Sequence, residues 1–300
     1  MPSPQTGIFA LGTSSHAYLE LDLDPGCDAA AAVERVASLR EPRTTIGGVN
    51  LVAGFRPELW ASIAPADATP SGVTGFDEPI VGPTGVTMPA TQHDVVIWLT
   101  GSGYDVVFDL SRAVVMGLAG VATVANEIVG WPYHHDLDLT GFIDGTENPS
   151  LVEATSVAVV PDGGPGAGAS ILLLQQWLHD AIAWESLPIP EQESIIGRRR
   201  ADSVELDPKP PDSHVARNDQ DQFGKIFRRN IAYGTLSDHG TIFVGFCQHQ
   251  RILRAMLESM AGVGGGPPDR LTSVTHALTG AYYVIPSADA LAAMGPVASD

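Results

Sequence analysis

The sequence predicts an α+β fold made of two similar units, each with antiparallel strands covered on one face by helices. An apolar, strand-like run leads into an amphipathic helix once in each half of the chain, at residues 94–118 and again at residues 241–260. The length of 300 residues and the hydrophobic content of 44% are typical of one large folded domain or of two smaller ones.

Hydropathy patterns predict the elements of the first half. Apolar and polar residues alternate over residues 16–23, which is typical of a strand, and residues 29–39 have the spacing of an amphipathic helix. A glycine- and proline-rich stretch over residues 65–89 predicts a long loop. The first unit is completed by a strand at 94–100, a helix at 104–118 and a strand at 121–131.

The second half shows similar patterns. Its predicted strands lie at residues 157–160, 170–177, 226–233, 241–247 and 281–285, and its predicted helices at residues 190–196 and 250–260. We place the boundary between the units near residues 132–140. This gives an N-terminal domain of residues 1–135 and a C-terminal domain of residues 136–300.

Charge and composition argue against several classes of partner. The chain has 35 acidic and 16 basic residues, which gives a formal net charge of -19. The negative electrostatic field of such a protein repels nucleic acid and anionic lipid. The sequence shows no signal-peptide pattern and no apolar run long enough to span a membrane. Cys27 and Cys247 belong to no CxxC or CxxCH motif, which argues against structural zinc and covalently attached haem. We therefore expect a cytoplasmic protein.

The segment Gly141–Pro149 (GFIDGTENP) contains the first candidate site residue, Asp144. Asp-Gly and Asn-Pro are common turn dipeptides, so one interpretation is a surface turn. The other interpretation is a general base, because Phe142 and Ile143 would bury the approach to Asp144. The flanking glycines would also let the backbone pass close to a large flat ligand. Composition alone leaves both interpretations open.

The second candidate is His214, in the segment Asp212–Asn218 (DSHVARN) after a proline-rich stretch. A single histidine in a loop is commonly solvated or hydrogen-bonded. Imidazole is nevertheless the usual axial ligand of haem iron, and one protein ligand suffices where a porphyrin supplies the other four. A zinc site would need three or four protein ligands. His214 is therefore either a solvated histidine or an iron ligand.

The third candidate set lies in the strand-like run Phe227–Thr235 (FRRNIAYGT). Side chains alternate along a strand, so Arg228 and Asn230 share one face and Arg229 takes the other. On an outward face, the paired arginines would form surface salt bridges. On an inward face, an arginine and an asparagine are costly unless they serve a ligand.

Taken together, these segments resemble the dye-decolorising peroxidase family. The ordered motifs carry the resemblance: GxxDG at residues 141–145, an SHVAR-type segment with His214, and RRN at residues 228–230 followed by an aromatic-Gly pair. A further landmark ends at Arg200, where the family form has lysine. The similarity is densest over residues 90–285, and the compact length resembles the bacterial, cytoplasmic B/P-type branch.

The resemblance implies two ferredoxin-like domains with antiparallel sheets covered by helices, and a haem pocket mainly in the second domain. It implies one non-covalent b-type haem per chain, with His214 as the iron ligand and Gly145, Thr146 and Arg198 as further cofactor-binding residues. Family members often form homo-oligomers, as dimers or larger, and some bind encapsulin shells through a C-terminal tail. Residues 293–300 contain no extension of the Gly-Ser-Leu kind, which argues against encapsulin association.

For the reaction, the resemblance implies reduction of hydrogen peroxide through a ferryl intermediate, and one-electron oxidation of dyes or of phenolic and other aromatic reductants. Asp144 would move the peroxide proton, Arg228 would stabilise charge on the departing oxygen, and Asn230 would orient the peroxide. His214 would donate its other ring N–H to an acceptor that the sequence does not identify. The alternative is a non-catalytic haem carrier or sensor of the same fold, which would need neither Asp144 nor Arg228.

Overall fold

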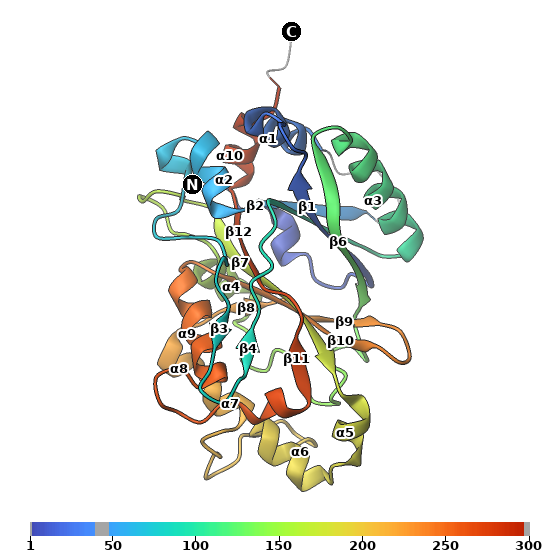
Figure 1. Ribbon diagram of the computed structural model, residues 1–300, viewed down its shortest axis with the longest axis vertical. Helices are drawn as coiled ribbons and strands as arrows, with labels where there is room; N and C mark the ends of the chain where they lie inside the picture. Colours follow the sequence, from blue (N-terminus) through green and yellow to red (C-terminus); the bar gives the residue numbers. More distant parts are fainter. Residues whose placement is uncertain (1, 40–47, 297–300) are drawn as a thin grey trace.

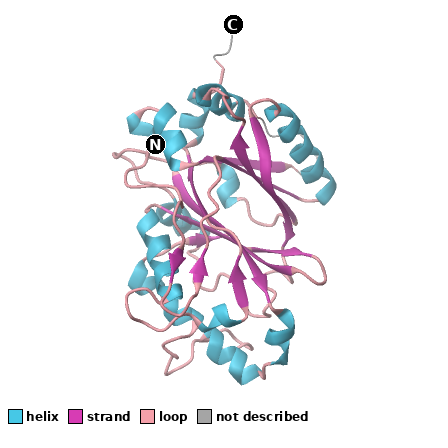
Figure 2. Cartoon of the chain, viewed as in Figure 1, coloured by secondary structure: helices cyan, strands magenta, loops and turns pink. Residues whose placement is uncertain are grey.

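The computed structural model describes residues 2–39 and 48–296, which form an α+β fold with one large antiparallel sheet (Figures 1 and 2). The strands of this sheet are β1 (Ser15–Leu23), β2 (Val49–Phe55), β5 (Val95–Gly101), β6 (Ala122–Trp131), β7 (Ser170–His179), β8 (Phe227–Arg228), β9 (Ile231–Gly234), β10 (His239–Cys247), β11 (Thr275–Ala277) and β12 (Ala281–Ile285). A separate hairpin consists of β3 (Ile80–Val81) and β4 (Thr87–Met88), inside the stretch predicted as a long loop.

The large sheet closes on itself through β7. One edge of β7 pairs with β10, and the other edge pairs with β11 and then β12. The cycle runs β7-β12-β2-β5-β1-β6-β9-β10 and returns to β7, so the two ferredoxin-like halves share one barrel-like sheet. β12 belongs to the second half of the sequence but pairs with β2 of the first, at Val284 and Phe55. The division into domains at residues 135 and 136 stays a prediction.

Helices pack around this sheet. They are α1 (Ala29–Ala37), α2 (Pro57–Ile63), α3 (Tyr104–Leu118), α4 (Leu151–Ala158), α5 (Ala181–Ser186), α6 (Ile189–Ile196), α7 (His214–Arg217), α8 (Gln220–Phe223), α9 (Gln250–Ala261) and α10 (Ala288–Ala293), with short 3-10 turns at Thr6–Phe9, Ala66–Ala68 and Arg270–Ser273. In Figure 1, α1, α2 and α3 lie around the end of the molecule built from the first half, while α5 to α9 surround the opposite end. The hairpin β3–β4 packs against α9, so the first half also contributes to the second half's surroundings.

Strand alternation divides the core into an inner and an outer part. Tyr18 and Trp98 pack in a cluster with residues from all the strands of the closed cycle, which places this cluster inside the barrel. Their neighbours Leu19 and Leu99 point the other way, into a cluster under α1 and α3. β5 and β12 are therefore buried on both faces, which is why their sequences are nearly continuous apolar runs.

Most predicted elements are present, and the first-half elements agree with α1, β1, β5, α3 and β6 to within two residues at each end. The strand predicted over residues 157–160 is wrong. A capping box of Ser150 and Glu153 starts the helix α4, which takes in the first two of these four residues. Val159 pairs with Ser170 in an isolated bridge, and the Val160 N–H donates to the Ala169 carbonyl at 2.8 Å.

The strand predicted over residues 226–233 is interrupted at Arg229 and Asn230, between β8 and β9. The side-chain oxygen of Asn230 accepts a hydrogen bond from the backbone N–H of Val244 on β10, at 2.9 Å. This side-chain hydrogen bond takes the place of one backbone hydrogen bond to β10. The alternation predicted for Arg228, Arg229 and Asn230 survives the interruption, as the site below shows.

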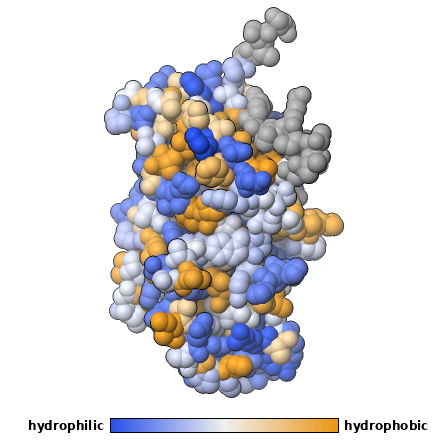
Figure 3. Space-filling view, turned by 90° about the vertical axis from the view of Figure 1, so that its right-hand side faces the viewer, coloured by the Kyte–Doolittle hydropathy of each residue, from blue (hydrophilic) through white to orange (hydrophobic). Residues whose placement is uncertain are grey.

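The face of the molecule drawn in Figure 3 has no large hydrophobic area. On the face drawn in Figure 3, hydrophobic residues form separate small patches among polar ones. Among residues 2–39 and 48–296, no helix combines the length and the apolar character needed to cross a membrane.

Arg229 ties the N-terminal segment to the sheet. Its guanidinium donates to the carbonyls of Ile8 and Ala10, both at 2.7 Å, and lies 5.1 Å from the centre of the Trp98 ring. Burial lowers the pKa of Arg229 to about 10, so the side chain stays charged near neutral pH. The charge is thus neutralised by carbonyl dipoles and an aromatic face rather than by a carboxylate.

Replacing Arg229 with methionine should lower the free energy of unfolding by about 2 to 5 kcal/mol, because two carbonyl groups lose their donors at about 1–3 kcal/mol each. Urea denaturation measures this change. The control is Arg254→Met on α9, an exposed arginine paired with Glu258, which should change the free energy by less than about 1 kcal/mol. Equal unfolding midpoints for the two variants would contradict the anchoring role.

Candidate active site

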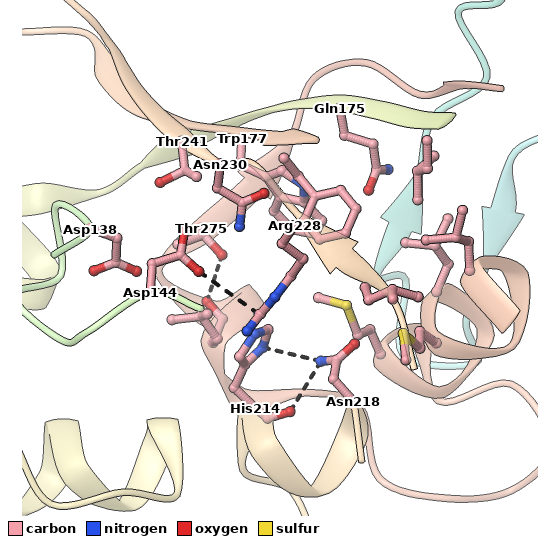
Figure 4. A pocket seen from close by; sticks show the side chains of 18 of the residues that line it. Asp138, Asp144, Gln175, Trp177, His214, Asn218, Arg228, Asn230, Thr241 and Thr275 are labelled. Carbon is pink, nitrogen blue, oxygen red and sulfur yellow. Dashed lines mark hydrogen bonds and ion pairs between the residues drawn. The ribbon is translucent and has the colours of Figure 1, made fainter. Parts of the chain in front are cut away.

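A cavity of about 900 Å³ lies in the second half of the chain, between the sheet and the helices α7 and α9 (Figure 4). β7 forms one wall with every second side chain along its length: Leu173, Gln175, Trp177 and His179. An apolar wall comes from α9: Leu253, Met256, Leu257 and Met260.

His214 lies at the start of α7 and faces this cavity. Ser213 caps the helix, because its hydroxyl accepts from the backbone N–H of Ala216. The ring Nδ1 of His214 lies 2.7 Å from Oδ2 of Asp269, whose side chain is fully buried. Asn218 donates to the backbone carbonyl of His214 at 3.0 Å and stands next to the same carboxylate.

The Asp269 carboxylate determines the electrostatic state of the ring. Burial alone would lower the pKa of His214, but the charge of Asp269 and its hydrogen bond outweigh burial and raise this pKa above its usual value. An Nδ1–H that donates to Asp269 leaves the lone pair of Nε2 free for a metal. Asp269 is therefore the acceptor that the sequence did not identify, and it lies 55 residues from His214 with no local motif to indicate it.

Asp144 is held at the polar end of the cavity by the loop predicted around it. Its backbone N–H donates to the carbonyl of Asp136 at 2.7 Å. Gly141 and Gly145 have φ of +81° and +79°, so the turns before and after Asp144 need glycine. Phe142 is buried as expected, but Ile143 is 43% exposed and does not bury the approach to Asp144. The position of Asp144 thus depends on the loop rather than on a hydrophobic pair.

Arg228 and Asn230 both reach the cavity, whereas Arg229 points away from it. The Nη1 of Arg228 lies 3.9 Å from Oδ1 of Asp144. Asn148, from the same loop as Asp144, donates to the Arg228 carbonyl at 2.9 Å and accepts from its N–H at 2.8 Å. The structure therefore brings Asp144, Arg228 and Asn230 together. Figure 4 shows that their side chains and the side chain of His214 point into the same cavity.

Asp138 is a further carboxyl group at this end of the cavity, and it is not among the site residues predicted from the sequence. Its Oδ1 accepts from the backbone N–H of Thr140 at 2.8 Å and also from the Thr140 hydroxyl. Burial, together with the neighbouring charge of Asp144, raises the pKa of Asp138 to about 6. The polar end thus contains two carboxyl groups, of which Asp138 has a perturbed pKa.

Gly145, Thr146 and Arg198 lie beside the cavity rather than in its lining. Gly145 and Thr146 continue the loop after Asp144. Arg198 donates to a carboxylate oxygen of Glu147 in that loop and, at 2.7 Å, to Glu205. Through these contacts Arg198 attaches the Asp144 loop to the segment that precedes His214.

Arg200, the departure from the family form, packs directly on the Asp144 loop. Its guanidinium lies 5.9 Å from the centre of the Phe142 ring and donates to the Gln192 side chain at 3.0 Å. A Cβ at Gly141 would collide with this guanidinium. The larger side chain is thus accommodated because the loop has glycine at this position.

The chemistry of the cavity fits a haem group. One imidazole has a free nitrogen, and an apolar wall is available for the hydrocarbon periphery of a porphyrin. The Nε of Arg228 is buried without a hydrogen-bond partner among the described residues, so its guanidinium has bonding capacity left for a ligand. No group of three or more His, Cys, Asp or Glu side chains suited to a bare metal ion occurs in the described ranges.

Comparison with known proteins assigns the chain to a family. Residues 135–290, more than half of the chain, match the family model described as Dyp-type peroxidase, C-terminal. A dye-decolorising peroxidase from Mycolicibacterium paratuberculosis is 33% identical, over 95% of this chain and 84% of that protein. The chain belongs to the dye-decolorising peroxidase family. The members of this family are haem enzymes.

Solved structures extend the similarity over nearly the whole enzyme. A dye-decolorising protein from V. cholerae is 32% identical with a TM-score of 0.87, covering 96% of this chain and 99% of that one. A variant of DypB from Rhodococcus jostii, in complex with haem, is 31% identical with a TM-score of 0.88, covering 98% and 99%. The predicted fold class is thereby confirmed.

The raised pKa of Asp138 predicts a pH-dependent stability. Between the ordinary pKa of 3.8 and the folded value of about 6, the folded enzyme keeps a proton that the unfolded chain has lost, so the free energy of unfolding falls as pH rises. Asp138→Asn keeps the acceptor for Thr140 but cannot ionise. Relative to the wild type, it should gain about 1 to 3 kcal/mol between pH 4 and pH 7. Urea denaturation at several pH values measures this gain.

The matched control for Asp138 is Asp162→Asn, in an exposed turn. Its stability curve should run parallel to that of the wild type across the same pH range. A parallel curve for Asp138→Asn as well would show that this carboxyl group titrates normally.

Proposed function

We propose that this enzyme reduces hydrogen peroxide with one non-covalent b-type haem per chain, and takes the electrons one at a time from dyes or from small phenolic and other aromatic reductants. The observation that carries the proposal is the arrangement of Asp144, Arg228 and His214 around one cavity that has an apolar wall. A haem carrier or sensor would need the axial ligand alone. The haem complex of the Rhodococcus jostii variant supports the choice of cofactor.

On the proximal side, His214 would hold the iron through Nε2 while Nδ1–H donates to Asp269. Bound haem supplies an iron that accepts peroxide and the oxidising equivalents released from it. The Asp269 carboxylate makes the imidazole a more electron-rich ligand, which favours oxidised states of the metal. Because Asp269 is fully buried, solvent does not weaken this interaction.

On the distal side, Asp144 would take a proton from the bound peroxide and return it to the outer oxygen, so that the O–O bond can break with water as the leaving group. The cation of Arg228 stabilises the negative charge that develops on that oxygen. The side-chain oxygen of Asn230 is already occupied by Val244 N–H, so its NH₂ group is free to orient the peroxide.

We assign Gly145, Thr146 and Arg198 to the edge of the cofactor. Gly145 and Thr146 would present backbone to it, since the glycine lets the loop approach closely. Arg198 would act through the loop that it holds, because both of its carboxylate partners are already in place at Glu147 and Glu205.

We further propose that the enzyme works in the cytoplasm as a homo-oligomer, without a nucleic-acid or membrane partner. Free Cys27 and Cys247 support a reducing compartment, and the net charge of -19 opposes binding to phosphate-rich surfaces. The expectation of no encapsulin association concerns a tail whose last residues, 297–300, lie outside the described residues.

His214→Ala should lose most of the bound haem, because the iron loses its protein ligand. This loss should exceed the loss in Asp269→Asn, which changes only the hydrogen-bond partner of the iron ligand. Changing such a partner typically weakens metal binding by about 10- to 100-fold. The Soret absorbance per chain after reconstitution with haem measures both. His276→Ala, on the exposed side of β11, is the control. A normal Soret band in His214→Ala would place the iron ligand elsewhere.

Asp144→Ala and Arg228→Ala should keep haem but react slowly with peroxide. The second-order rate constant for the reaction with peroxide should fall by a factor of about 10²–10⁴ in Asp144→Ala and of about 10²–10³ in Arg228→Ala. Stopped-flow recording of the Soret change measures these constants. Asp109→Ala and Arg112→Ala on the exposed face of α3 are matched controls. Unchanged constants in both distal variants would remove the proposed assignment.

A further inference from the structure

A second chamber adjoins the haem cavity. It lies between the segment 133–140, the helix α5 and the strand β11 and is partly open to solvent. Thr140, His179 and Thr275 line both spaces and therefore form their common wall. A molecule in the chamber would be separated from a cofactor in the main cavity by this one layer of side chains.

The lining of the chamber suits a small aromatic molecule with a hydroxyl group. Tyr133 and Trp184 supply aromatic surfaces, and the Trp184 ring is fixed because its N–H donates to the Thr140 carbonyl at 3.0 Å. His239 and His179 supply imidazoles for hydrogen bonds. The lining also contains the carboxylate of Glu185 and no lysine or arginine, so it disfavours a sulfonate or a carboxylate.

In the shared wall, His179 has one ring nitrogen without a hydrogen-bond partner among the described residues. Its Nε2 lies 3.2 Å from the Thr241 hydroxyl, while its Nδ1 makes no hydrogen bond within the described ranges. Burial, with a smaller contribution from His239, lowers the pKa of His179 to about 4. The imidazole is therefore neutral over most of the pH range and has one nitrogen able to take a proton.

We propose that this chamber binds the phenolic reductant, and that His179 accepts its phenolic proton. The inference rests on the proposed peroxidase function and gives its reductant a binding site. In each turnover step the O–H bond of one phenol breaks, the proton passes to His179 and then to solvent, and one electron crosses the shared wall to the oxidised cofactor. Two phenols and one peroxide thus give two phenoxyl radicals and two waters.

Binding is tested without turnover. Isothermal titration of the resting holoenzyme with hydroquinone, in the absence of peroxide, gives a dissociation constant. Ala181→Phe fills the chamber from α5 and should weaken binding about tenfold or more, whereas Ile182→Phe adds a ring to a side chain that is 85% exposed on the same helix and should not. Equal dissociation constants for the two variants would overturn the proposal.

The role of His179 is tested with two electron donors. Ferrocyanide gives an electron without a proton, so the ratio of the rate constants for hydroquinone and ferrocyanide isolates proton transfer. This ratio should fall about tenfold in His179→Phe and also in His179→Gln, which can form a hydrogen bond to the phenol but cannot take up a proton. A ratio equal to that of the wild type in both variants would overturn the proposal, and this test decides the matter if Ala181→Phe does not fold.

The reaction of the wild type with peroxide alone separates this inference from the proposed function. Absence of any Soret change would end the peroxidase proposal, while hydroquinone binding would still be measurable. A normal Soret change, with hydroquinone binding and the rate ratio unaffected by the variants, would remove the chamber alone.

Discussion

Strand β7 is hydrogen-bonded along both edges, to β10 on one side and to β11 and β12 on the other. A strand paired in this way cannot slide without breaking two ladders, and a slip of one residue would turn every side chain to the opposite face. One face places Leu172 and Leu174 in the barrel core, and the other places Trp177 and His179 at the cavity. Closure of the barrel and the shape of the site therefore depend on one register.

The proximal side depends on a buried charge. A carboxylate without solvent contact is costly unless hydrogen bonds surround it, and Asp269 satisfies this condition by accepting from the Leu271 N–H and by pairing with His214. The same bonds orient the imidazole. Stability and ligand geometry are thus coupled, since the ring cannot turn away from the cavity without leaving the carboxylate unpaired.

Sequence patterns and the family resemblance selected side chains that line one cavity in the structure, while their roles stay predictions. Asp144 lies in a glycine-flanked loop motif, and His214 is of the residue type that haem iron requires. Arg228 and Asn230 were found by strand alternation, which survives because the Asn230 side chain fills the missing rung of the ladder. Closure of the sheet could not be predicted, because the pairing of β12 with β2 joins segments more than two hundred residues apart.

The residues that were missed are single polar residues in unremarkable stretches. Asp269, Asp138 and His179 acquire their properties from neighbours that are distant in the chain or from burial, and neither is visible in local spacing. The strand predicted at residues 157–160 failed for the opposite reason. There a local capping signal outweighed an apolar run, since a helix start satisfies several backbone groups at once.

The position of β12 near the end of the chain has a consequence for biosynthesis. The closed cycle needs residues 281–285, and the partner of His214 is residue 269, so both are made after β2 and β7. A nascent chain that lacks these residues therefore has an open sheet with unpaired edges on β2 and β7, and His214 has no carboxylate partner. Such edges invite pairing with other chains. The interval between synthesis of β7 and synthesis of β12 is thus the period in which these edges are exposed.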